Sequence, residues 1–245
     1  MTFLKEGFGW IILNLYELTG VYSLSIILMT ILFNVLMLPL AVKQIKSSEN
    51  MQRIQPQVQA IQKKYKNDKE TMNKKVMEIY QQNKVSPLSG CLPLLIQFPI
   101  VIALFSVLRE PEIWVFNHSH EGGKAVVESF LWISNLSLPD QLSEVLPGIS
   151  IAQYIPGILP IITAFLTYIQ MELSTPKTDN AGSSNEAQAA SGAMKNMKYL
   201  MPLMILVFSR NLSAGLVLYW ATGTIFRIGQ QLVMKKMSQS KETEL

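Results

Sequence analysis

This 245-residue sequence has few charged residues and almost no cysteine. Only 16% of the residues are charged, whereas ordinary soluble domains hold roughly 25%. The single cysteine, Cys91, cannot form an internal disulfide, so the chain has no disulfide framework and Cys91 should pack as a small apolar residue. Hydrophobic residues make up 49% of the chain and gather in long uncharged runs. This composition predicts a polytopic membrane protein.

The sequence also lacks the motifs of several kinds of catalysis. The HExxH and GxSxG motifs and the phosphate-binding loop are all absent. His118 and His120, with Glu121 beside them, could bind a metal. Two histidines in a solvent-exposed loop, with no ligand, are the more common explanation of this spacing. We therefore predict no enzyme, no metal and no cofactor. The lack of Asp and Glu in four of the five predicted spans argues against an ion-coupled transporter.

Long uncharged runs are what the sequence does contain. Residues 21–42 carry no charge and, as a helix rising 1.5 Å per residue, could cross about 30 Å of hydrocarbon. The fold class that we predict is all-α, with five transmembrane helices and a cytoplasmic helical hairpin. The expected spans are residues 21–42, 87–109, 154–172, 198–210 and 211–234.

The number of spans depends on how the C-terminal apolar region is divided. It could be one span with Arg210 buried, but Asn211, Ser213 and Gly215 favour a hinge. With five spans, seventeen of the 21 Lys and Arg residues lie on one side of the membrane and four on the other. With four spans the division is thirteen to seven. The positive-inside rule therefore favours five spans, with the N-terminus outside and the C-terminus in the cytoplasm.

The segments between the spans differ in character. Residues 1–20 do not have the pattern of a convincing signal peptide. They predict either an interfacial helix on the outer side, anchored by Trp10 and Tyr16, or an apolar lead-in to the first span, and the sequence favours the two equally. Residues 110–153 should form an external loop and residues 173–197 a disordered cytoplasmic linker. Residues 235–245 are expected to be a cytoplasmic tail.

Residues 43–86 predict a basic cytoplasmic hairpin of two amphipathic helices. Apolar residues recur at 3.5-like spacing on both sides of a break at Lys66–Asn67–Asp68, and Pro56 should start or kink the first helix. The hairpin holds ten Lys and Arg against four Asp and Glu. Its basic face could simply be solvated, or it could dock on anionic lipid or ribosomal RNA. The candidate recruiting residues are Lys63, Lys64, Lys74 and Lys75.

Uncharged polar residues lie deep within the predicted spans. They could be interhelical hydrogen-bonding groups worth about 1 kcal/mol each, or they could line a hydrated cavity open to cytoplasm and lipid. Asn34 lies about 12 Å of helix rise from the end of the first span, and a polar group there would be costly against hydrocarbon. The candidate cavity residues are Thr30, Asn34, Gln97, Thr163, Thr167, Gln170, Tyr219, Trp220 and Thr224.

The chain resembles the YidC/Oxa/Alb family of membrane protein insertases in three long motifs. In chain order they are TILFNVLMLPLAVKQIKSSENMQRIQP, PLSGCLPLLIQFPIVIALFSVLR and MPLMILVFSRNLSAGLVLYW with a trailing GQQ. The resemblance implies an insertase or chaperone of the bacterial plasma membrane, without the large periplasmic domain of some members. It also implies a groove in the inner leaflet, open to cytoplasm and lipid, that receives nascent hydrophobic segments.

The resemblance further implies partners and roles. The partners would be nascent membrane proteins, the ribosome, the lipid bilayer and the Sec translocon, with no specific DNA binding, and the chain would be a monomer. Asn34, Gln97 and Gln170 would hold water in the groove, and Tyr219 and Trp220 would offer a surface to the sliding segment. The alternatives are a small transporter or channel, and a non-catalytic assembly scaffold beside the translocon.

One position departs from the family pattern. The family usually has an Arg in the first span, thought to attract acidic residues of the substrate's translocated tail, where this chain has Asn34. Either another cation substitutes, or this chain prefers less acidic tails. Arg210 is a poor substitute because it falls at the outer turn. Independently of this position, the last two spans can lengthen by snorkelling of Lys195, Lys198 and Arg227.

Overall fold

The computed structural model describes residues 2–83, 92–117, 129–146, 148–149, 152–174 and 198–243. Within these residues the secondary structure is helical, with isolated β-bridges and no strand, which confirms the all-α class. The remaining predictions on Cys91, His118, His120 and Glu121, and on most of the linker 173–197, concern residues outside this part of the chain.

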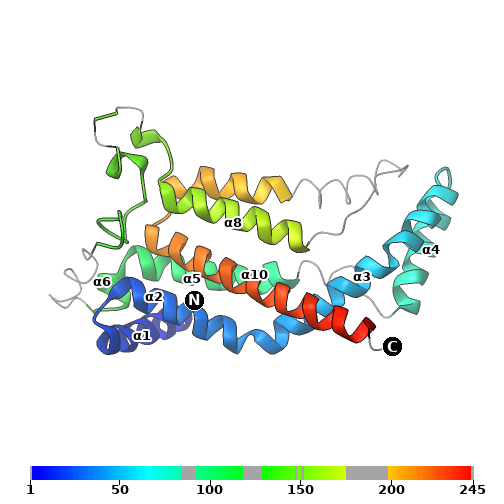
Figure 1. Cartoon of the computed structure of the whole chain (residues 1–245), viewed down its shortest axis with the longest axis horizontal. Helices are drawn as coiled ribbons and strands as arrows, with labels where there is room; N and C mark the ends of the chain where they lie inside the picture. The colour runs from blue at the N-terminus through cyan, green and yellow to red at the C-terminus, as the bar shows by residue number, and fades with distance from the viewer. Residues whose placement is uncertain are drawn as a thin grey trace.

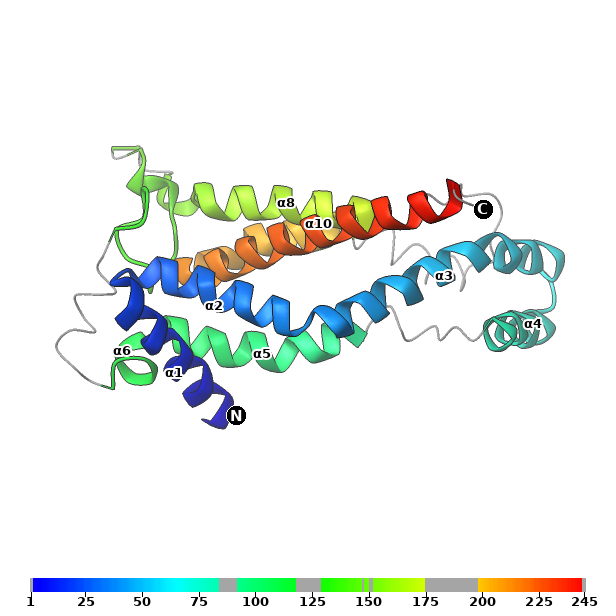
Figure 2. The ribbon, with the colours of Figure 1, turned by 60° about the horizontal axis from the view of Figure 1, so that its bottom comes forward.

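Long helices run along the length of the molecule, and α10 lies among the others (Figures 1 and 2). Helix α10 (Ala214–Thr243) contacts α8 (Ile158–Ser174), α2 (Tyr22–Leu36) and α5 (Leu92–Arg109). Residues 198–208 form a further helix that ends at the 3-10 turn η4 (Ser209–Asn211). This turn lies where the sequence predicted a hinge, and Arg210 is exposed on it.

The first predicted span is bent. Helix α2 ends at Leu36, and α3 (Leu38–Lys64) begins one residue later at an angle of 59° to it. Pro39 explains the break, because it has no N–H to donate to the carbonyl of Val35 and its ring crowds that carbonyl. Helix α3 then continues past residue 42, so the expected boundary between span and hairpin is not a helix boundary. No single helix of the described residues has the length and apolar composition to span a membrane, but α2 and α3 together do.

Helices α3 and α4 (Lys69–Gln82) contact each other at one end of the molecule (Figure 2). The chain turns between them at the predicted break, and the apolar residues Ile54, Val58 and Met72 are buried. Pro56 lies inside α3 and does not start a helix. Asp68 caps α4 by accepting a hydrogen bond of 3.1 Å from the Thr71 amide.

The opposite end of the molecule holds α1 and several short helices. Helix α1 (Thr2–Thr19) packs against α2, α5 and α6 (Pro111–Trp114) and buries Phe8 and Ile12. The 3-10 helices η2 (Leu142–Glu144) and η3 (Ala152–Tyr154) precede α8, which begins at Ile158, slightly later than the predicted start of that span at residue 154. Helix α10 runs through to Thr243 without a break at the predicted boundary of the tail.

Candidate functional site

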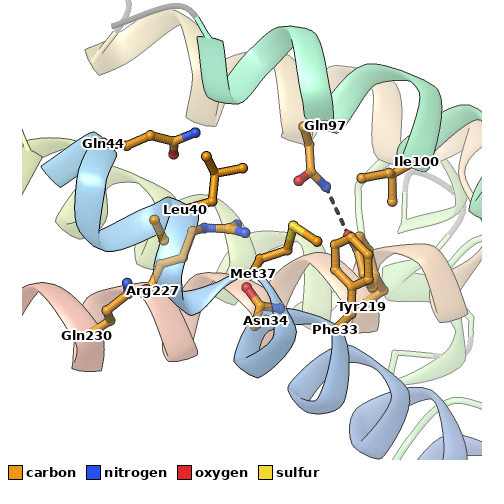
Figure 3. Close-up of a pocket in the computed structure, with 11 residues that line it drawn as sticks. Phe33, Asn34, Met37, Leu40, Gln44, Gln97, Ile100, Tyr219, Arg227 and Gln230 are labelled. Carbon is orange, nitrogen blue, oxygen red and sulfur yellow. Dashed lines mark hydrogen bonds between the residues drawn. The ribbon is translucent and has the colours of Figure 1, made fainter. Parts of the chain in front are cut away.

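A cavity of about 590 Å³, open to the surroundings, lies where α2, α3, α5 and α10 meet (Figure 3). The 59° bend at Met37 helps to form it, because α3 leads away from the line of α2 at the cavity wall. Its polar lining residues are Asn34, Gln44, Gln97, Tyr219, Arg227 and Gln230, and its apolar ones are Phe33, Met37, Leu40, Ala41 and Ile100.

Two polar contacts fix the inner wall of the cavity. The Gln97 amide on α5 donates a hydrogen bond of 2.9 Å to the Tyr219 hydroxyl on α10. The Asn34 amide donates one of 2.7 Å to the Thr30 carbonyl one turn earlier in α2. Tyr219 is only 5% exposed, so its ring is part of the wall. The first contact joins two helices, and the second leaves one N–H of Asn34 free to donate elsewhere.

Arg227 brings a positive charge to this cavity. Its Nη2 donates a 3.3 Å hydrogen bond to the Thr224 hydroxyl one turn earlier in α10. The guanidinium lies over Gly223: a side chain at that position would start 3.3 Å from Nη1 of Arg227 and 3.6 Å from Nδ2 of Asn34. No Asp or Glu is among the residues that line the cavity. Its charge is therefore positive, with amides and one hydroxyl around it.

Comparison with known proteins relates the chain to one family. A family model described as "60Kd inner membrane protein" matches residues 14–242. The membrane protein insertase YidC of Fusobacterium nucleatum is 36% identical over 95% of this chain and 96% of that relative, and the YidC of Oceanobacillus iheyensis is 37% identical over 96% and 82%. A crystal structure of an active YidC insertase with its first transmembrane domain resolved matches with a TM-score of 0.62 and 30% identity. The match covers 94% of this chain and 45% of that one.

The chain belongs to the YidC family of membrane protein insertases. This confirms the family and the insertase function that the three sequence motifs implied, and it makes the chain a bacterial inner-membrane protein. The solved insertase is the longer chain, because the match takes up less than half of it.

In this YidC family member, the structure brings together some of the predicted groove residues. Asn34, Gln97 and Tyr219 line the cavity, and Thr30 and Thr224 are fully buried and hydrogen-bonded to two of its lining residues. Tyr219 differs from the expectation that it would offer an open surface, because its ring is buried and its hydroxyl is held by Gln97.

Other predicted groove residues lie apart from the cavity. Thr163 and Thr167 are buried in α8, and each hydroxyl donates to a carbonyl of its own helix, at 2.7 and 2.8 Å. Gln170 in α8 and Trp220 in α10 are partly exposed and do not line the cavity. Back-bonding to the i−4 carbonyl satisfies a threonine within its own helix. The structure therefore gives Thr163 and Thr167 a local role.

Sequence reasoning missed Arg227, Met37, Gln44 and Gln230 as cavity residues. Two signals were present: Pro39 lies two residues after Met37, and Gly223 lies about one helical turn before Arg227, at i and i+4. A proline bends the helix that carries it, and residues four apart share one helix face. A small residue before the arginine therefore leaves room for the long side chain to lie back along the helix.

The predicted recruiting lysines lie on α3 and α4, away from the cavity. Lys63, Lys64 and Lys74 are exposed, and the Lys64 ammonium lies 5.5 Å from the ring centre of Tyr65. Lys75 donates a 2.7 Å hydrogen bond to Glu78, and this bond raises the pKa of the Lys75 ammonium. Lys75 is thus already paired, and the other three are the more available charges. The described residues contain no group of three His, Cys, Asp or Glu arranged to hold a metal ion.

Proposed function

We propose that this chain inserts membrane proteins by holding the polar tail of a nascent segment in the cavity while its apolar part moves into lipid. The observation that carries the proposal is an open, polar and cationic cavity walled by Asn34, well inside the apolar helix α2, and by Arg227, at the end of the apolar part of α10. Asn34 lies twelve residues into α2, about 18 Å of rise at 1.5 Å per residue. A tail held there is already part of the way across.

The energetics suit such a cavity. A polar group without a partner in hydrocarbon costs several kcal/mol, so a hydrated cavity that shortens the dry path lowers the barrier to crossing. Burial of the apolar segment in lipid supplies the driving force at about 25 cal/mol per Å². The insertion step then needs no nucleotide hydrolysis.

Exposed apolar residues lie on α8, which packs against α10, and on the helix of residues 198–208. Phe165 on α8, and Leu203 and Val207 in the helix of residues 198–208, are each more than half exposed. In a membrane such a face contacts lipid, and it can equally contact an apolar segment leaving the cavity. The proposed route therefore runs from the polar cavity along apolar helix faces into the bilayer.

The orientation and the hairpin complete the proposal. The five-span arrangement with the N-terminus outside rests on the distribution of Lys and Arg, and it puts α4 and the part of α3 beyond residue 42 in the cytoplasm. We assign Lys63, Lys64 and Lys74 to the recruitment of the ribosome or of anionic lipid, because they are exposed and their charges are not neutralised by the ion pair that Lys75 makes.

Reconstitution tests the proposed function. The purified chain in lipid vesicles should insert a single-span substrate that protein-free vesicles do not insert, as measured by protease protection of the tail. A photo-crosslinker at Ile100, which lines the cavity, should trap the substrate, and one at Lys236, on the distal part of α10, should not. Solute flux through vesicles without any substrate would instead indicate a transporter. Insertion only after a secretion translocon is added would indicate an assembly scaffold.

A further inference from the structure

Arg227 carries a charge that the described part of the protein does not neutralise. None of the carboxylates in the described residues forms an ion pair with it, and its one hydrogen bond to a side chain is the bond to Thr224 of its own helix. It thus makes no side-chain hydrogen bond that joins α10 to another helix. A guanidinium has five N–H donors, so most of them remain for a ligand.

The direction of the side chain is opposite to that of a snorkelling arginine. Its guanidinium contacts Thr224 and lies over Gly223, so the side chain runs back toward the start of α10 and away from the end of the helix that the sequence predicts to be cytoplasmic. Figure 3 shows the guanidinium directed toward the space that Met37, Leu40 and Gln97 also border. The charge is therefore held inside the cavity.

The groups nearest to Arg227 are donors as well. Asn34 Nδ2 and Arg227 Nη1 both lie next to the free space above Gly223, and Gln230 Nε2 is buried with no hydrogen-bond partner in the described structure. The Tyr219 hydroxyl accepts from Gln97, which leaves its proton free to be donated. The acceptors among the residues that line the cavity are neutral amide and hydroxyl oxygens, and no carboxylate is among them. An anion is the ligand that would complete this cluster.

We propose that Arg227 is a specificity-determining residue that binds a carboxylate in the tail of the inserting segment, with Asn34 as the second donor. The inference rests on the proposed function, because it needs a tail in the cavity. The proposal places the positive charge of this cavity on α10, where Gly223 leaves room for the guanidinium. The ligand class is an Asp or Glu side chain in the tail, because a bidentate guanidinium–carboxylate pair is a strong charge-assisted contact.

The test is a ratio of insertion efficiencies. One single-span substrate is made with zero or two Asp in its tail, and the efficiency for the acidic tail is divided by that for the neutral tail. Arg227→Gln should lower this ratio about tenfold, the effect of losing one charge-assisted hydrogen bond. Arg227→Lys should keep most of it. Lys236→Gln, which removes an exposed cation farther along the same helix, should leave the ratio unchanged.

Two further variants test the geometry. Gly223→Leu places side-chain atoms where the guanidinium lies and should lower the ratio as Arg227→Gln does. The double variant Asn34→Arg with Arg227→Asn exchanges the two side chains across the cavity and should restore the ratio. Thermal unfolding in detergent checks that each variant is folded. If Arg227→Gln does not fold, Arg227→Lys and the double variant still test the role of Arg227.

The outcomes separate the two proposals. An equal ratio in the unmodified protein and in Arg227→Gln overturns the role of Arg227, even when both proteins insert the neutral tail well. An equal fall for both tails that Arg227→Lys reverses also overturns it, because the charge would then serve insertion in general. No insertion of either tail by the unmodified protein above protein-free vesicles overturns the proposed function itself.

Discussion

Asp140 is a buried carboxylate that holds the start of α8. Its Oδ2 accepts hydrogen bonds from the Leu159 amide at 2.8 Å and the Trp132 indole at 3.3 Å, whereas its Oδ1 has no partner in the described structure. Burial raises the pKa of this carboxyl above its ordinary value of 3.8, and the two hydrogen bonds oppose the rise. The native state therefore holds the proton more tightly than the unfolded chain does.

That shift predicts how stability depends on pH. A carboxyl with a raised pKa contributes stability at low pH that is lost as pH rises from 3.8 through its folded pKa. We expect Asp140→Asn to remove this dependence, because an amide does not titrate and still offers an oxygen to the Leu159 N–H. The measurement is the difference in unfolding temperature between the two proteins from pH 3.5 to pH 7 in detergent. A constant difference would contradict the prediction.

Arg227 shows why part of the site could not be predicted at the residue scale. The polarity of Asn34, Gln97 and Tyr219 within apolar runs was enough to select them, and all three line the cavity. The position of Arg227 near the end of an apolar run fits a snorkelling side chain equally well. Which way it points is decided by the space over Gly223 and by Asn34 on another helix, and these are tertiary contacts.

At the scale of elements, the packing of α1 depends on one glycine. A Cβ at Gly9 would lie impossibly close to the backbone carbonyl oxygen of Trp114, whereas a Cβ at Gly7 would meet nothing within 4 Å. We expect Gly9→Ala to cost about 1–3 kcal/mol of stability, because the clash is with backbone that cannot give way. Gly7→Ala on the same helix should instead stabilise by about 0.5–1 kcal/mol. Denaturation in detergent measures both, and equal effects would contradict the predicted packing.

The bend between α2 and α3 gives a second prediction at this scale. Pro39→Ala restores an amide donor for the Val35 carbonyl and should allow α2 and α3 to join in a straighter helix. Spin labels at the exposed positions Leu24 and Asn50 should then move apart by about 5 Å, from the rise of 1.5 Å per residue and the loss of the 59° bend.

Pro56→Ala is the matched control for that experiment. Pro56 also lies inside α3 but beyond both labels, so its replacement should leave the distance between Leu24 and Asn50 unchanged. If Pro39→Ala also leaves the distance unchanged, the bend is imposed by packing against α10 and α5 and not by the proline.

The elements themselves were largely predictable, and their boundaries were less so. The hinge near Arg210 and the turn at Lys66–Asn67–Asp68 follow from local turn chemistry, and helices end at both. The boundary expected after residue 42 marks a change from apolar to basic residues. A helix continues through such a change as long as its backbone hydrogen bonds are intact, and α3 does so. Pro39 removes the hydrogen bond to the Val35 carbonyl, so α2 ends before it, at Leu36.

At the scale of the whole molecule, the charge distribution and the shape support the same orientation. Helix α6 and α4 lie at opposite ends (Figures 1 and 2). Residues 43–86, the segment that supplies most of α3 and all of α4, hold ten Lys and Arg, whereas the two predicted sides of the membrane differ little in Asp and Glu. Because Lys and Arg set the orientation of membrane proteins while Asp and Glu contribute little, the end with α4 should face the cytoplasm.

Cysteine labelling in intact cells tests this orientation. Cys91 is first replaced by Ser, which removes the native thiol, and single cysteines are then placed at Glu112 on α6 and at Lys64 on α3, both exposed. A membrane-impermeant maleimide should label position 112 in intact cells and position 64 only after the membrane is opened, because the charge bias puts the two positions on opposite sides. Labelling of position 64 but not 112 in intact cells would invert the orientation. The cavity would then open to the outside, and it could not receive a segment arriving from the cytoplasm.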